Sequence, residues 1–126
     1  MAPLRENNPS VRILNHEGLD ESCGGDPEFA RELFQDLSGR ATQLRQALHD
    51  GLAAGNPDAV RKAAHELKGS SLTLGADAVA DLCKRLEILG HEKKIEEVPA
   101  LLADLDTELA RLWAYLKEKG IYPASA

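Results

Sequence analysis

His65 is followed by a lysine three residues later and by a glycine four residues later. Residues three and four apart share one face of an α-helix, so Lys68 and Gly69 lie on the same face as the imidazole. The same polar stripe contains Asp58, Arg61, Lys62 and Leu72. The opposite side of this helix is small or apolar, as a face packed against other helices should be. We therefore predict that the His65 side chain points to solvent as an accessible nucleophile.

The residues around His65 favour phosphoryl chemistry. Glycine inside a helix is less stable than alanine by about 1 kcal/mol, so Gly69 indicates that something large approaches the ring. Lys68 places a positive charge beside it, and Arg61 and Lys62 add two more on the preceding turn. Phosphoryl transfer needs mainly positioning and charge neutralisation from its protein surroundings. This pattern is typical of a histidine that receives phosphate from one protein and gives it to another.

Periodic apolar residues predict the helices that must position this histidine. The four long helices are expected at about 26–55, 57–74, 76–89 and 95–119, with a short capping helix within 11–19 that Gly18 breaks. Asp26-Pro27 and Asn56-Pro57 are helix start signals. Helix ends are expected at Gly51, Gly55, Gly75, Gly90 and Gly120. The first long helix is expected to bury Phe29, Leu33, Phe34, Leu37, Leu44, Leu48 and Leu52. The sequence thus predicts an all-α protein with short connections and no strands.

Composition limits the classes of function. The 126 residues suit one domain, and 43% hydrophobic with only 4% aromatic residues indicates a core of leucine and alanine. We expect a leader at 1–10, a bundle domain at 11–120 and a frayed tail at 121–126. The net charge of −6 argues against binding to nucleic acid or to anionic membranes. Two distant cysteines form no zinc or disulfide pattern, and no run is long enough to span a bilayer, so a cytoplasmic protein is expected.

Seven residues of this stretch fit the motif His-x-Leu-Lys-Gly-x-Ser/Ala followed by Gly-Ala: His65, Leu67, Lys68, Gly69, Ser71, Gly75 and Ala76. That motif resembles the one in histidine-containing phosphotransfer (HPt) domains, and the helix pattern from about 26 to 119 is similar too. The resemblance implies an antiparallel up-down-up-down four-helix bundle. It implies a phosphocarrier of phosphorelays, not an enzyme that binds ATP. Its partners would be receiver domains of response regulators and hybrid histidine kinases, which would hold the Mg²⁺, so no cofactor or metal is expected on this chain.

Glu87 is a candidate partner of the ring. The resemblance implies that it occupies the position where other HPt domains commonly have a Gln or Glu that contacts the ring nitrogen distal to phosphate. A carboxylate that accepts from Nδ1–H would also fix the tautomer, leave Nε2 as the nucleophile and raise its basicity. The alternative is a surface glutamate paired with Lys84 or Arg85.

A receiver needs a surface on which to dock. Gly69, Leu72 and Ala76 are expected to form a small exposed patch beside the histidine, of the size that transient signalling contacts use. Arg61 and Lys62 either contact the acidic pocket of a receiver or are ordinary solvated charges. We expect a monomer. A different class of function stays open, in which the bundle is a non-phosphorylated scaffold or interaction module and the histidine is unused.

Overall fold

The computed structural model describes residues 12–121, and this part of the chain is helical and contains no strand. Its elements are α1 (His16–Cys23), α2 (Pro27–Ala53), α3 (Pro57–Thr73), α4 (Asp77–His91), the short 3₁₀ turn η2 (Ile95–Glu97) and α5 (Val98–Glu118). The predicted all-α class is therefore confirmed. The predicted leader and all but the first residue of the predicted tail lie outside the described residues. None of the helices in residues 12–121 has the length and apolar character that crossing a membrane would require.

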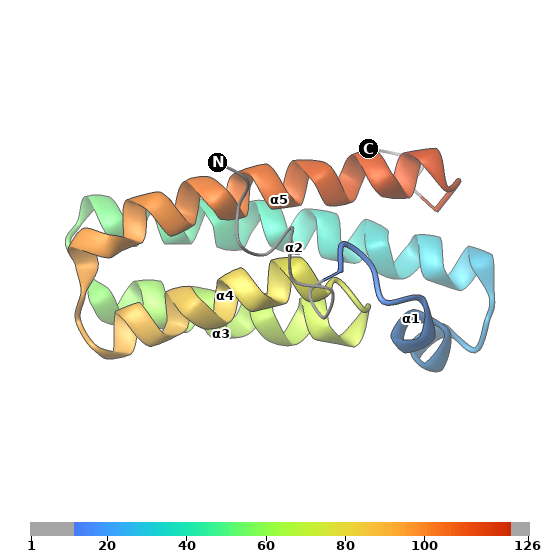
Figure 1. Ribbon diagram of the computed structural model, residues 1–126, viewed down its shortest axis with the longest axis horizontal. Coiled ribbons are helices and arrows are strands. Elements are labelled where there is room, and N and C mark those ends of the chain that lie inside the picture. The colour runs from blue at the N-terminus through green and yellow to red at the C-terminus, as the bar shows by residue number, and fades with distance from the viewer. Residues whose placement is uncertain (1–11, 122–126) are drawn as a thin grey trace.

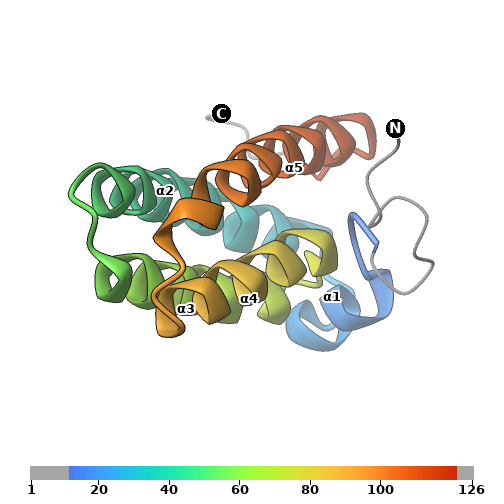
Figure 2. The ribbon, with the colours of Figure 1, turned by 60° about the vertical axis from the view of Figure 1, so that its left-hand side comes forward.

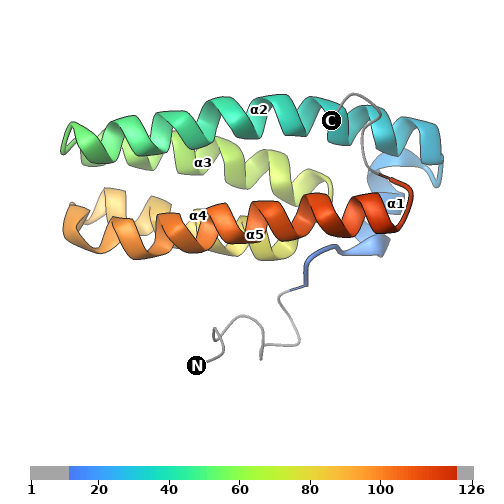
Figure 3. The ribbon, with the colours of Figure 1, turned by 90° about the horizontal axis from the view of Figure 1, so that it is seen from above.

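The four long helices form a bundle of two layers, with α2 and α5 in one layer and α3 and α4 in the other (Figures 1 and 3). Helix α3 has its most extensive contacts with α4 and the next most extensive with α2. The short helix α1 lies at one end, beside the start of α2 (Figures 1 and 2). The histidine-bearing helix is thus supported by one neighbour from each layer.

The predicted helix starts are confirmed in detail. The Asp26 side chain accepts hydrogen bonds from the backbone N–H groups of Glu28 and Phe29, and the Asn56 side chain accepts one from Ala59. Each cap is followed by a proline, whose missing N–H is harmless in the first turn. These caps fix where α2 and α3 begin, and therefore where His65 lies along α3.

Three glycines predicted to break or end helices lie inside them instead. Gly18 is within α1, Gly51 within α2 and Gly90 within α4. Gly51 and Gly90 are buried where helices approach closely: a Cβ at Gly90 would lie 2.7 Å from the carbonyl oxygen of Pro57 and 2.8 Å from the amide nitrogen of Arg61. The turn after α4 instead uses Lys93, at a φ of 59°. Gly90 therefore lets α4 pack against the first turn of α3.

Buried leucines and small residues fill the space between the helices, as predicted. The apolar stripe of α5 is buried along its whole length: Val98, Leu102, Leu105, Leu109, Leu112 and Leu116. Phe29 is a wrong prediction, because its side chain is 42% exposed. Helix α2 has 27 residues and α3 only 17, so the first turn of α2 extends beyond the end of α3. Phe29 lies in this first turn, beyond the end of α3.

The corner between α3 and α4 is held by the chain that precedes α1. Gly75 turns the chain at a φ of 77°, as predicted for a left-handed cap. Its carbonyl accepts a 2.6 Å hydrogen bond from the N–H of Asn15, and the carbonyl of Arg12 accepts a 2.8 Å bond from the N–H of Ala78. These bonds satisfy backbone groups that a helix end would otherwise leave unpaired. They also cover Ala76, which is fully buried.

Alanine substitutions should separate the two kinds of helical glycine. Gly90→Ala should destabilise the fold by about 1–3 kcal/mol, since its Cβ would overlap the backbone of α3. Gly69→Ala should stabilise it by about 0.5–1 kcal/mol, because nothing lies within 4 Å of the added methyl group. Gly39→Ala, equally open on α2, is the matched control. Urea unfolding followed by circular dichroism measures all three, and a Gly90→Ala variant as stable as the parent would contradict the close approach.

Candidate functional site

His65 lies near the middle of α3 with its side chain 65% exposed. The face of α3 that packs on the bundle carries Val60, Ala63, Ala64, Leu67 and Ser71, all of which are buried. The predicted division of this helix into a polar outer face and a small apolar inner face is confirmed. Ser70 departs from it: its side chain is half-buried, and its hydroxyl donates to the carbonyl of Glu66. The imidazole is accessible because the inner face is filled by other residues.

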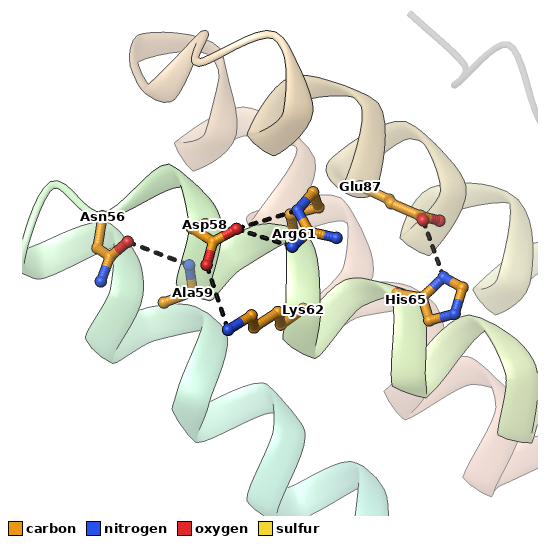
Figure 4. A network of polar contacts seen from close by, with 7 residues as sticks. All are labelled: Asn56, Asp58, Ala59, Arg61, Lys62, His65 and Glu87. Atoms are coloured by element: carbon orange, nitrogen blue, oxygen red, sulfur yellow. Dashed lines mark hydrogen bonds and ion pairs between the residues drawn. The ribbon is translucent and has the colours of Figure 1, made fainter.

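One ring nitrogen of His65 is bound to α4. Its Nδ1 lies 2.8 Å from Oε2 of Glu87, in the contact that the sequence predicts (Figure 4). An ionised carboxylate can only accept, so Nδ1–H donates. In the neutral ring the other nitrogen, Nε2, then carries the lone pair. Nothing within residues 12–121 hydrogen-bonds to Nε2, which is therefore the nitrogen available to react.

The same carboxylate binds Lys68. The ammonium of Lys68 donates to Oε1 of Glu87 at 2.7 Å, and both side chains are only about a quarter exposed, 26% and 22%. The hydrogen bond from Lys68, followed by that from His65, lowers the pKa of Glu87 below its ordinary value of 4.5, although partial burial opposes the shift. Glu87 is therefore ionised at neutral pH. Its alternative partner Arg85 binds Asp81 instead, at 3.1 Å.

The basic residues on the preceding turn are paired as well. Arg61 and Lys62 contact the two carboxylate oxygens of Asp58 at 2.8 Å and 3.3 Å (Figure 4). The hydrogen bond from Arg61, followed by that from Lys62, lowers the pKa of Asp58. The three predicted cations therefore do not converge on His65 as one unpaired cluster, since Arg61 and Lys62 share Asp58 while Lys68 is held by Glu87.

The surface next to the ring is open and partly apolar. Nothing lies within 4 Å of a Cβ built at Gly69, so the backbone there is bare, as predicted. Leu72, one turn from Lys68, is 55% exposed. The placement of Ala76 on this exposed patch is wrong, because its side chain is buried beneath the chain that precedes α1.

An open groove of about 390 Å³ runs between α2 and α3 beyond Gly69, and the sequence alone did not reveal it. It is lined by Leu33, Asp36, Leu37, Arg40, Ser70, Thr73 and Leu74. Arg40 pairs with Glu66, the residue after the histidine. No local pattern predicts such a groove, because it arises where two helices far apart in sequence lie side by side. It extends the accessible surface around His65 toward α2.

Three other side chains with reactive atoms are hydrogen-bonded or buried in the described region. His16 Nε2 is 2.8 Å from the Tyr115 hydroxyl, and His49 Nε2 is 3.1 Å from Asp106. Cys83 is fully buried, and burial, with a smaller effect from the charge of Glu87, raises the pKa of its thiol to about 12. That thiol stays protonated at neutral pH and is no nucleophile. Residues 12–121 contain no group of three or more His, Cys, Asp and Glu side chains arranged to hold a metal ion.

Comparisons with known proteins bear on the family of this chain. A search of curated proteins finds no match. Among solved structures, the fold is similar to the crystal structure of histidine-containing phosphotransfer protein B (HptB) from Pseudomonas aeruginosa PAO1. The TM-score is 0.77 at 26% sequence identity, over 86% of this chain and 95% of that one. The profile of the Hpt domain family matches residues 28–115, which span α2 to most of α5 and include both His65 and Glu87. The chain therefore belongs to the Hpt domain family of phosphorelay signalling proteins.

Proposed function

We propose that this chain is a phosphorelay intermediate in which His65 accepts a phosphoryl group from a receiver-domain aspartate and passes it to another receiver. Hpt domains are phosphocarrier modules, not kinases. The observation that carries the assignment is the state of the ring: Nδ1–H is held by Glu87 while Nε2 is exposed and unbound within the described chain. In the neutral ring this arrangement leaves the Nε2 lone pair facing outward, so Nε2 can attack phosphorus while the proton stays on Nδ1.

The transfer step follows from that ring. The Nε2 lone pair attacks the phosphorus of the aspartyl phosphate, so that a P–N bond forms as the acyl P–O bond breaks. The aspartate leaves as a carboxylate. The proton stays on Nδ1, so the phosphorylated ring is cationic and its charge faces the ionised carboxylate of Glu87. The reverse sequence of bond changes passes the phosphoryl group to the next aspartate.

The docking surface lies on α3 and extends toward α2. Gly69 provides the gap through which the receiver approaches, and Leu72 together with the groove between α2 and α3 provides apolar contact. Arg61 and Lys62 face the partner from the preceding turn, where release from Asp58 would let them bind acidic groups. The Mg²⁺ and most catalytic groups belong to the receiver. This chain supplies no cofactor and does not bind ATP.

We also propose how the helices are arranged, where the domain begins and ends, and where the protein acts. We place α2 to α5 in an up-down-up-down bundle capped by α1, within a domain at 11–120 that is flanked by a leader at 1–10 and a tail at 121–126. Contacts of Gly51 and Gly90 with the first turns of α3 support this arrangement. The protein acts as a monomer in the cytoplasm, where its receiver partners reside.

Phosphotransfer to His65 can be tested directly. Incubation with labelled ATP and Mg²⁺ alone should leave the chain unlabelled. Addition of receiver domains phosphorylated in advance, tested as a panel, should label it, and the label should be acid-labile, as a P–N bond is. His65→Gln should abolish labelling, whereas His91→Gln, a change at an exposed histidine at the end of α4, should not. Label that persists in His65→Gln would refute the assignment, and absence of transfer from every receiver would favour the scaffold function.

The gap at Gly69 should matter for transfer and not for folding. Gly69→Gln should slow transfer from a receiver by about tenfold or more, because its side chain would occupy the space over the helix next to the ring. The fold should persist, since glutamine is a better helix former than glycine. The rate of transfer is measured in quenched reactions and the stability in thermal melts. Gly39→Gln is the control for an added side chain on another helix. A Gly69→Gln protein that transfers at the parent rate would show that the gap is not the route of approach.

A further inference from the structure

One carboxylate serves two donors at this site. Oε2 of Glu87 accepts from Nδ1–H of His65, and Oε1 accepts from the ammonium of Lys68. Both distances, 2.8 Å and 2.7 Å, are those of charge-assisted hydrogen bonds. Glutamine could bind the same ring nitrogen through its amide oxygen, but it would carry no charge to hold the lysine. The choice of an acid at position 87 therefore acts on Lys68 as well as on His65.

Phosphorylation would create a second anion within reach of this lysine. The phosphoryl group on Nε2 carries about two negative charges, whereas Glu87 carries one. Lys68 has a single ammonium on a flexible four-carbon chain and is three residues from His65 on the same helix. The other α3 cations, Arg61 and Lys62, are bound to Asp58. The ammonium is thus the group for which Glu87 and the phosphoryl group would compete.

We propose that Glu87 competes with the phosphoryl group for the ammonium of Lys68. The phosphohistidine is then less stable than it would be without the carboxylate, and it donates its phosphoryl group to the next receiver more readily. Lys68 has to give up part of its ion pair to stabilise the phosphoryl group, so the phosphorylated state gains less from the lysine than it would beside a neutral residue. Glu87 acts here through Lys68, as a positioning residue. It sets the balance between acceptance of a phosphoryl group by His65 and its donation to a receiver. This inference rests on the proposed function and adds to it a way of biasing the direction of transfer.

The balance can be measured without a receiver by using phosphoramidate as the phosphoryl donor. In that reaction the P–N bond to ammonia breaks, a P–N bond to Nε2 forms, and ammonia leaves, while the proton on Nδ1 stays in place. Each variant is incubated in the same mixture of phosphoramidate and ammonium until the phosphohistidine signal in the ³¹P NMR spectrum is constant. The ratio of phosphorylated to free His65 then reports the relative stability of the phosphohistidine.

The variants are Glu87→Gln, Lys68→Met and the double substitution. Glu87→Gln should raise the ratio roughly two- to fivefold, the range expected when one partly exposed ion pair is removed from competition. Lys68→Met should lower the ratio. In the Lys68→Met background, Glu87→Gln should leave the ratio unchanged or lower it, because no lysine is released and only the attraction between the carboxylate and the cationic ring is lost. Glu92→Gln is the matched control: it removes a carboxylate that pairs with Lys94 after the end of α4, and it should leave the ratio unchanged.

Two results would overturn the inference. If Glu87→Gln does not raise the ratio, the carboxylate is not competing for the lysine. If it raises the ratio equally with and without Lys68, the effect is direct repulsion between Glu87 and the phosphoryl group. Both results are distinct from a failure of the proposed function, which would appear as absence of transfer from receivers even though phosphoramidate modifies His65.

Discussion

The hydrogen bond between Nδ1–H of His65 and the carboxylate of Glu87 is the interaction on which this site depends. It joins α3 to α4 and requires that two residues from different helices lie at the same level along the bundle. Two glycines make that register possible. Gly75 allows the sharp corner between the helices, and Gly90 allows α4 to contact the first turn of α3 directly. Glu87 is three residues before Gly90, so the close approach that requires a glycine also brings the carboxylate to the ring.

This interaction positions the ring more than it stabilises the fold. Ion pairs at partly exposed positions contribute about 0–1 kcal/mol to folding, whereas the buried leucines between the helices each contribute roughly 1.5–3 kcal/mol. Substitutions at Glu87 or Lys68 should therefore change the chemistry of His65 in a protein that still folds. The separation of a buried apolar interior from a polar surface network would let the chemistry proposed for His65 be tuned at little cost in stability.

Local signals in the sequence predicted the parts of this structure that depend on one helix at a time. The caps at Asp26 and Asn56, the buried stripe of α5 and the exposure of His65 each follow from residues close together in the chain. Contacts between helices decided the rest. Gly69 meets open space, as predicted, but Gly90, predicted to end a helix, lies inside α4 against the backbone of α3.

Three further features likewise depend on partners distant in the chain: the burial of Ala76, the ion pair between Lys68 and Glu87, and the groove between α2 and α3. The resemblance to HPt domains supplied the position of Glu87, and the chemistry of a carboxylate that accepts from Nδ1–H supported the same prediction independently.

The function proposed for this site requires that Glu87 hold the proton on Nδ1 and leave Nε2 as the nucleophile. The most direct measurement is the tautomer of the neutral His65 ring, read from its two ¹⁵N chemical shifts at alkaline pH. We expect the Nδ1–H tautomer in the parent protein and in Glu87→Gln, whose amide oxygen still accepts, and a shift toward Nε2–H in Glu87→Ala. A parent protein whose neutral ring carries its proton on Nε2 would contradict the account.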